Sequence, residues 1–124
     1  MKISIRNIIV GLKNIWRWRK VIFKDRDCDY WYTYEILKTK LKFQADYIRK
    51  YSYHESAQDS INQILDCVDL IDKVQNDYYI EQALDGLDVY GWTDVMFDEA
   101  IKRQDAAKKL LFSTLEANME SWWS

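Results

Sequence analysis

The sequence predicts an all-α protein, a compact bundle of about five helices of which two are long. The 124 residues contain no proline and three glycines, whereas a chain of this length ordinarily has about six prolines and nine glycines. Strand-rich folds need more turns than so few helix breakers allow. Apolar residues make up 48% of the chain and charged residues 31%, which is typical of a folded protein. We therefore expect one α-helical domain over residues 1–124.

The first predicted helix runs from about Ser4 to Phe23. Placed at 100° steps, its apolar residues share one face, formed by Ile5, Ile8, Ile9, Leu12, Ile15, Trp16, Ile22 and Phe23. The other edge of the helix carries a basic stripe about 60° wide, formed by Arg6, Lys13, Arg17, Lys20 and Lys24. Arg19 is an exception, because it projects from the middle of the apolar face. Since the chain has few other apolar helix faces, we expect this one to pack inside the bundle.

The second predicted helix runs from about Cys28 to Tyr51, after a break at Lys24–Asp29 in which Asp25 or Asp27 can cap its start. It has two apolar faces. One carries Tyr30, Tyr34, Leu37, Leu41, Ala45 and Ile48, the other Tyr32, Ile36, Phe43 and Tyr47, and a third side carries Trp31, Lys38, Lys42 and Arg49. A helix buried on two sides lies in the centre of its bundle or between subunits, so association of copies through the second face is expected.

The third predicted helix follows Ser56, which forms a variant capping box with Asp59. Its core stripe consists of Ile61, Ile64, Leu65, Val68, Ile71 and Val74, and Asp72 falls inside this stripe. A short fourth helix is expected over Asp77–Asp85, stopped by Gly86.

A loop over Leu87–Trp92 then leads to Thr93, which can cap the last helix from Asp94 to about Ser121. The apolar face of that helix carries Phe97, Ala100, Ile101, Ala107, Leu111, Phe112, Leu115, Met119 and Trp122.

Charge is unevenly divided along the chain. Residues 1–50 carry 13 Lys and Arg against 5 acidic residues, a net charge of +8, and residues 51–124 carry 5 against 15, a net charge of −10. Three explanations fit: the basic and acidic helices pair within one molecule, copies associate head to tail, or a basic surface stays free for an anionic partner.

Catalytic and metal-binding patterns are not recognisable in the sequence. The acids from Asp25 to Asp29 resemble the start of a calcium loop, but the positions that require Gly and Glu hold Tyr30 and Ile36. His54 is the only histidine, Cys28 and Cys67 match no zinc or disulfide pattern, and no glycine-rich phosphate loop is present. We therefore expect a protein that is not an enzyme and has no metal site or cofactor. We also expect neither a transmembrane segment nor a secretory signal, which favours the cytoplasm.

Two features suggest binding. Arg19 and Asp72 are full charges on apolar helix faces, so we expect them to pair with each other, to line a polar pocket, or to reach solvent at the edge of the face. Aromatic residues also alternate with cations between Trp16 and Trp31, a combination that suits phosphates and bases, although core packing and an anionic membrane surface are alternative explanations. The candidate ligand-binding residues are Arg17, Arg19, Lys20, Lys24, Arg26, Tyr30, Trp31 and Asp72.

Two parts of the chain carry a family resemblance. One is the segment Ile22-Phe23-Lys24-Asp25-Arg26-Asp27-Cys28-Asp29-Tyr30, continued by Tyr34, Leu37, Lys40-Leu41 and Tyr47, and the other is the closing Trp122-Trp123. The chain resembles a group of small uncharacterised proteins of tailed bacteriophages, whose pattern has an aromatic residue in place of Cys28 and an acid in place of Ser124. The resemblance implies a role inside an infected bacterium and no particular activity.

Together, these observations predict a non-enzymatic phage accessory binding protein. Its expected partner is an anionic, nucleotide-type host ligand or a host protein, as for a counter-defence factor, and it is expected to form a homo-oligomer. The alternative is a nucleic-acid-binding protein that uses the basic first helix.

Overall fold

The computed structural model describes residues 4–52, 55–85 and 93–123, and within these ranges it confirms the all-α bundle. The helices are α1 (Ile5–Lys24), α2 (Tyr30–Tyr51), α3 (Ala57–Gln75), α4 (Tyr78–Leu84) and α5 (Asp94–Asn118), followed by the 3₁₀ helix η2 (Met119–Trp123). No strand occurs in the ranges that the structure describes. The helix boundaries lie within a few residues of those expected from periodicity, because few residues in the chain interrupt a helix other than at its ends.

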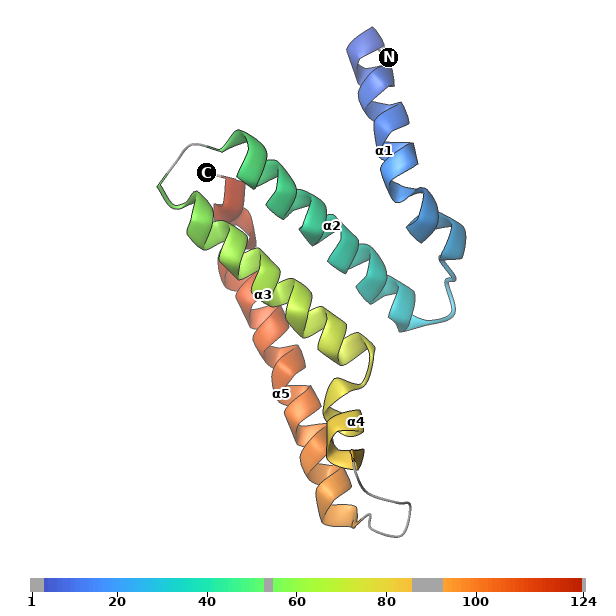
Figure 1. Ribbon diagram of the computed structural model, residues 1–124, viewed down its shortest axis with the longest axis vertical. Coiled ribbons are helices and arrows are strands. Elements are labelled where there is room, and N and C mark those ends of the chain that lie inside the picture. The colour runs from blue at the N-terminus through green and yellow to red at the C-terminus, as the bar shows by residue number, and fades with distance from the viewer. Residues whose placement is uncertain (1–3, 53–54, 86–92, 124) are drawn as a thin grey trace.

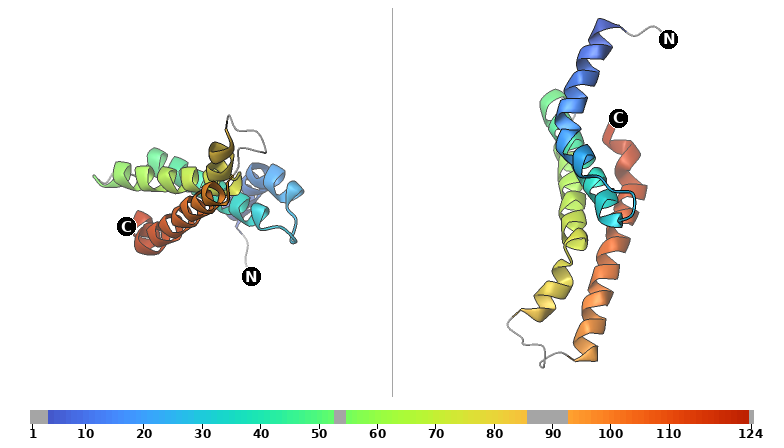
Figure 2. Two further views of the ribbon diagram at one scale, coloured as in Figure 1. Left: turned by 90° about the horizontal axis from the view of Figure 1, so that it is seen from below. Right: turned by 90° about the vertical axis from the view of Figure 1, so that its right-hand side faces the viewer.

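Helix α3 is the central element of the bundle. It packs against α2 on one side and against α5 on the other, and the three helices run side by side in Figure 1. The short α4 turns away from the end of α3 and lies against the beginning of α5. Helix α1 is set apart and contacts α2 only lightly. The right-hand view of Figure 2 shows α1 extending past the end of the bundle.

The hydrophobic core lies where α2, α3 and α5 meet. Its buried members are Leu41, Ala45, Ile48, Ile61, Ile64, Cys67, Ile71, Leu111, Leu115 and Trp122. The indole Nε1 of Trp122 donates a hydrogen bond of 2.8 Å to Oε1 of Gln63, which ties η2 to α3. The predicted core stripe of α3 is confirmed except for Leu65, which is 40% exposed. The stripe of α5 is buried in part, since Phe112 and Met119 on its margin are about half exposed.

Side-chain caps mark three of the helix starts. The Ser4 hydroxyl accepts from the Asn7 amide at 3.2 Å at the start of α1, and Thr93 Oγ1 accepts from the Met96 amide at 3.2 Å at the start of α5, as predicted. Helix α2 begins later than expected, because Asp29 is its cap and accepts from the Trp31 amide at 2.9 Å. Asp25 is instead the residue that ends α1.

One other helix start differs from the prediction. Ser56 precedes α3 without the side-chain capping bond that the variant capping box predicted. The expected Gly86 stop and the loop over Leu87–Trp92 lie outside the described residues.

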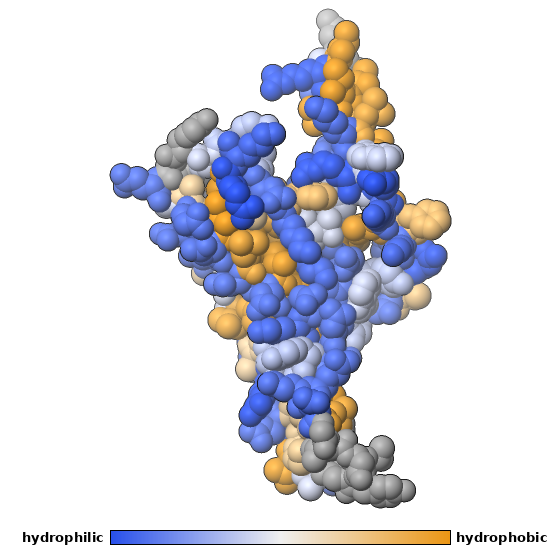
Figure 3. All heavy atoms as spheres, in the orientation of Figure 1, coloured by the Kyte–Doolittle hydropathy of each residue, from blue (hydrophilic) through white to orange (hydrophobic). Residues whose placement is uncertain are grey.

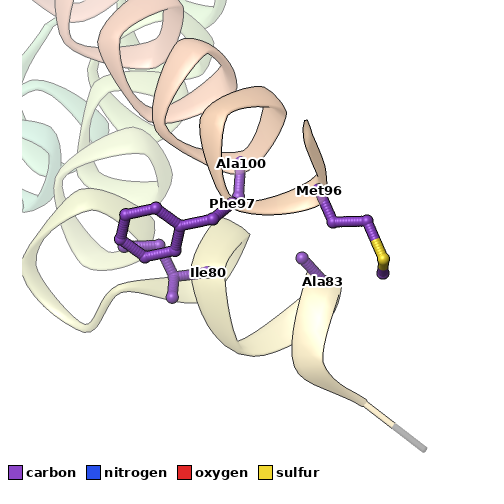
Figure 4. A pocket seen from close by; sticks show the side chains of 5 residues that line it. All are labelled: Ile80, Ala83, Met96, Phe97 and Ala100. Carbon is purple, nitrogen blue, oxygen red and sulfur yellow. The ribbon is translucent and has the colours of Figure 1, made fainter. Parts of the chain in front are cut away.

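Helices α4 and α5 pack against each other through apolar side chains. Ile80 and Ala83 of α4 face Met96, Phe97 and Ala100 of α5, as Figure 4 shows. The space between them has no room for a water molecule. This contact is therefore an extension of the core rather than a ligand cavity.

Candidate functional site

Helix α1 has no buried residue, in contrast to the prediction that its apolar face packs inside the bundle. The exposed fractions are 61% for Leu12, 65% for Ile15, 66% for Trp16 and 83% for Phe23. Figure 3 shows the resulting run of hydrophobic side chains on the outer side of α1. The physical reason is that α3 already receives α2 and α5 on its apolar stripe, so α1 docks on the far side of α2 by a different face.

The face that α1 turns toward α2 is narrow. The half-buried residues of α1 are Gly11, Trp18 and Val21, which lie outside the predicted apolar face. The ring of Trp18 meets Phe43 of α2 edge to face, with 5.1 Å between centroids. The guanidinium of Arg17 lies 3.9 Å from the centroid of the same Phe43 ring. Part of the predicted second apolar face of α2 is thus covered by α1, while Ile36 and Tyr47 on that face stay exposed.

The cations of α1 have no acidic partner among the described residues. The helix carries Arg6, Lys13, Arg17, Arg19, Lys20 and Lys24 and no acidic residue. The ion pairs of the described ranges lie within α2, α3 and α5 or between α2 and α3, and none includes these six cations. Pairing of the basic first helix with the acidic half of the same molecule is therefore absent from the part of the chain that the structure describes.

The predicted pairing of Arg19 with Asp72 is wrong. The Arg19 guanidinium stacks on Trp16, 3.7 Å from the ring centroid, and its Nη1 donates to the Trp16 carbonyl oxygen at 2.6 Å. Stacking on the neighbouring ring lets a cation stay on an apolar face while its charged end remains in water. This is the expected alternative in which the charge reaches solvent.

Asp72 instead contacts Lys38, a residue that sequence reasoning placed on a polar side of α2. Lys38 is buried, at 9% exposure, and its Nζ lies 3.3 Å from Asp72 Oδ1, 3.2 Å from Glu35 Oε2 and 2.8 Å from Gln75 Oε1. The three ammonium donors thus have three acceptors. Gln75 completes this Lys38 cluster by donating to Glu35 Oε2 at 2.8 Å and to the Trp31 carbonyl at 3.1 Å.

A signal for the Lys38 cluster was present in the sequence. Lys38 stands three and seven residues before Leu41 and Ala45 and therefore lies on the same side of α2 as these core residues. An acid inside the stripe of α3 needs a cation on the helix that packs against it. Because α2 and α3 are neighbours, the positions of Lys38 and Asp72 together indicate this ion pair.

The eight predicted ligand-binding residues do not share one groove. Arg17 lines a groove of about 230 Å³ between α1 and α2, together with Lys40, Phe43, Gln44 and Tyr47. Tyr30 lines a groove of about 430 Å³ between α2 and α5, together with Thr33, Tyr34, Leu37, Lys108 and Phe112.

The remaining predicted residues lie apart from one another. Lys20 and Lys24 are exposed on α1. Arg26 is held in the connection to α2, where its Nη1 donates to the Asp25 carbonyl at 2.7 Å. Trp31 is half-buried, and its ring packs edge to face on Tyr32 at 5.2 Å between centroids.

The described residues offer no arrangement typical of metal binding. They contain no group of three or more His, Cys, Asp or Glu side chains that could hold a metal ion. His54 lies outside the described residues. Cys28 is exposed, whereas Cys67 is buried in the core, and both are free thiols.

The candidate site is therefore the surface of α1, with an apolar face and a basic stripe side by side. Among the described residues, no helix has both the length and the apolar character needed to span a bilayer. In comparisons with known proteins, no family model, no curated protein and no solved structure matches the chain.

Proposed function

We propose that the protein is a non-enzymatic binding protein and that α1 is the element that recognises an anionic partner. The observation that carries this proposal is the positive charge of α1, which has no acidic partner among the described residues. Six cations and no acid stand on one helix that is exposed over most of its surface. Unneutralised cations on one helix attract anions and accelerate their association.

The biological setting of this function rests on the resemblance to tailed-bacteriophage proteins. In that setting, the protein acts in the cytoplasm of an infected bacterium as an accessory, counter-defence factor that captures a host component. Copies associate through the part of α2 that α1 leaves uncovered, where Ile36 is 40% and Tyr47 57% exposed.

The binding function is tested with heparin as a generic polyanion. The variant Lys13→Gln/Lys20→Gln/Lys24→Gln removes half of the cations of α1, and its matched control Lys102→Gln/Lys108→Gln/Lys109→Gln removes as many from α5. Fluorescence anisotropy with labelled heparin should show at least about tenfold weaker binding for the first variant, since each cation near an anionic surface contributes about 1 kcal/mol. The control variant should stay within about twofold. Equal weakening in both variants would contradict the proposal.

Nucleic-acid binding is the second candidate, favoured by the five cations gathered on one edge of α1. A single strand that contacts five phosphates should lose about 100-fold in affinity between 50 and 200 mM salt, as counterion release predicts. Anisotropy with a labelled 20-nucleotide strand measures this loss. A strand that binds as weakly at 50 mM as at 200 mM salt would eliminate this candidate.

A further inference from the structure

The exposed apolar face of α1 needs a partner that also tolerates the adjacent cations. We propose that this partner is an anionic lipid surface and that α1 lies in the membrane interface with its apolar face toward the acyl chains. This inference rests on the proposed function, because it names the anionic partner of the same helix.

The composition of α1 fits the interface of a bilayer. The exposed apolar face carries aliphatic side chains along its length and two large rings, Trp16 and Phe23. The basic stripe borders this face on one side, so that lysine and arginine stems can run along the surface while their charges reach lipid phosphates. A helix with these two faces lies in the interface plane and binds by apolar burial together with attraction to anionic lipids.

The position of α1 in the fold leaves this face accessible. The residues of α1 that contact Phe43 of α2 are Arg17 and Trp18, neither of which belongs to the exposed apolar face. The helix also extends past the end of the bundle (Figure 2). With 20 residues it offers a contact about 30 Å long. The acidic α3 lies on the other side of α2 (Figure 1).

Arg19 is compatible with this orientation although it projects from the apolar face. Its guanidinium stacks on Trp16 and bonds to a carbonyl of the same helix. Tryptophan rings prefer the headgroup level of a bilayer, and an arginine stacked on one is carried to that level. There, the guanidinium can bind a lipid phosphate.

A second copy of the chain is the competing occupant, and charge disfavours two ways of seating it on the apolar face of α1. Two α1 helices placed face to face would bring twelve cations together, six from each helix, with no acid on either. Seating α1 in the groove between α2 and α5 would place it beside Lys108, the charged residue of that groove. Like charges in contact oppose association, whereas phosphate headgroups neutralise the same cations.

The test is cosedimentation of the full chain with vesicles. Vesicles of phosphatidylcholine with one quarter phosphatidylglycerol are compared with vesicles of phosphatidylcholine alone. The variant Leu12→Gln/Ile15→Gln removes apolar area from α1 while keeping good helix formers. Its control is Leu110→Gln, because Leu110 is 55% exposed on α5.

The wild type should partition onto the anionic vesicles at least about tenfold more strongly than onto the neutral ones. Leu12→Gln/Ile15→Gln should lower the affinity for anionic vesicles at least about tenfold, because burying two aliphatic side chains contributes more free energy than a tenfold change requires. The Lys13→Gln/Lys20→Gln/Lys24→Gln variant should lower this affinity on the order of 100-fold. Leu110→Gln should stay within about twofold.

Three results would overturn the inference. Wild-type protein that fails to bind anionic vesicles, while heparin binding still depends on Lys13, Lys20 and Lys24, removes the lipid partner and leaves the proposed function intact. Wild-type protein that binds neither anionic vesicles nor heparin would contradict both the lipid partner and the proposed function. A dimer in light scattering at micromolar concentration that Leu12→Gln/Ile15→Gln dissociates would assign the apolar face to a second copy.

Discussion

Helices α1 and α3 carry apolar stripes of the same helical period, but the bundle uses them in opposite ways. The stripe of α3 is buried between α2 and α5, and Ile64, Cys67 and Ile71 on α3 have no exposed surface. The stripe of α1 remains exposed, and no residue of that helix is buried. The two helices also differ in charge, since α3 carries four acids and one lysine, and α1 six cations and no acid. Amphipathicity thus indicates that a face will be covered, while the position of the helix determines whether its own chain covers it.

The largest expected effect comes from replacing one isoleucine on each stripe by alanine and comparing the two costs. Ile64→Ala should lower the free energy of unfolding by about 2–5 kcal/mol, because it leaves a cavity in the core. Ile15→Ala should change it by less than about 0.5 kcal/mol, as for other exposed positions. Urea unfolding measures both values. A cost above about 1 kcal/mol for Ile15→Ala that grows with protein concentration would mean that a second copy buries the stripe of α1.

A smaller effect is expected at the one buried cation of the bundle that the structure describes, Lys38. Lys38→Ala should cost about 2 kcal/mol, below the usual cost of breaking a buried pair, because the Asp72 side chain is 59% exposed and can be rehydrated. The control Lys42→Ala removes an exposed lysine from the same helix and should stay within about 0.5 kcal/mol. Equal costs in urea unfolding would show that the Lys38 cluster contributes nothing beyond an ordinary surface lysine.

The smallest effect concerns the pH dependence of the buried face of α3. Burial, and secondarily the charge of Asp66, raise the pKa of the Cys67 thiol above its usual value. The unfolded chain therefore loses this proton first as the pH rises. The contribution to stability is complete below the unfolded pKa of about 8.5 and is lost progressively as the pH rises toward the folded pKa.

Urea unfolding at pH 7.5 and 9.2 tests this sign. The free energy of unfolding should fall over this range in the wild type and in Cys28→Ala, whose missing thiol is exposed. It should fall less in Cys67→Ala. A decrease of the same size in both variants would assign the pH dependence to other groups.

Several features of this protein could be predicted from local sequence. The scarcity of glycine and the absence of proline indicated the helices, and Ser4 and Thr93 lie at starts that the pattern predicted. The core stripe of α3 also followed from its period of 3.6 residues. The excess of positive charge on the first helix also followed from the sequence. These features depend on spacing along one helix, which the chain itself specifies.

The assignment of partners to faces depended on the tertiary structure. The apolar face of α1 stays outside the core because α3 packs between α2 and α5. Lys38 is buried beside Asp72 and Gln75 because α2 packs against α3. The helical period predicts which residues share a face, but it does not predict which element packs against that face. That choice is made by competition among all apolar faces for a limited core, because each face that is buried excludes another from the same place.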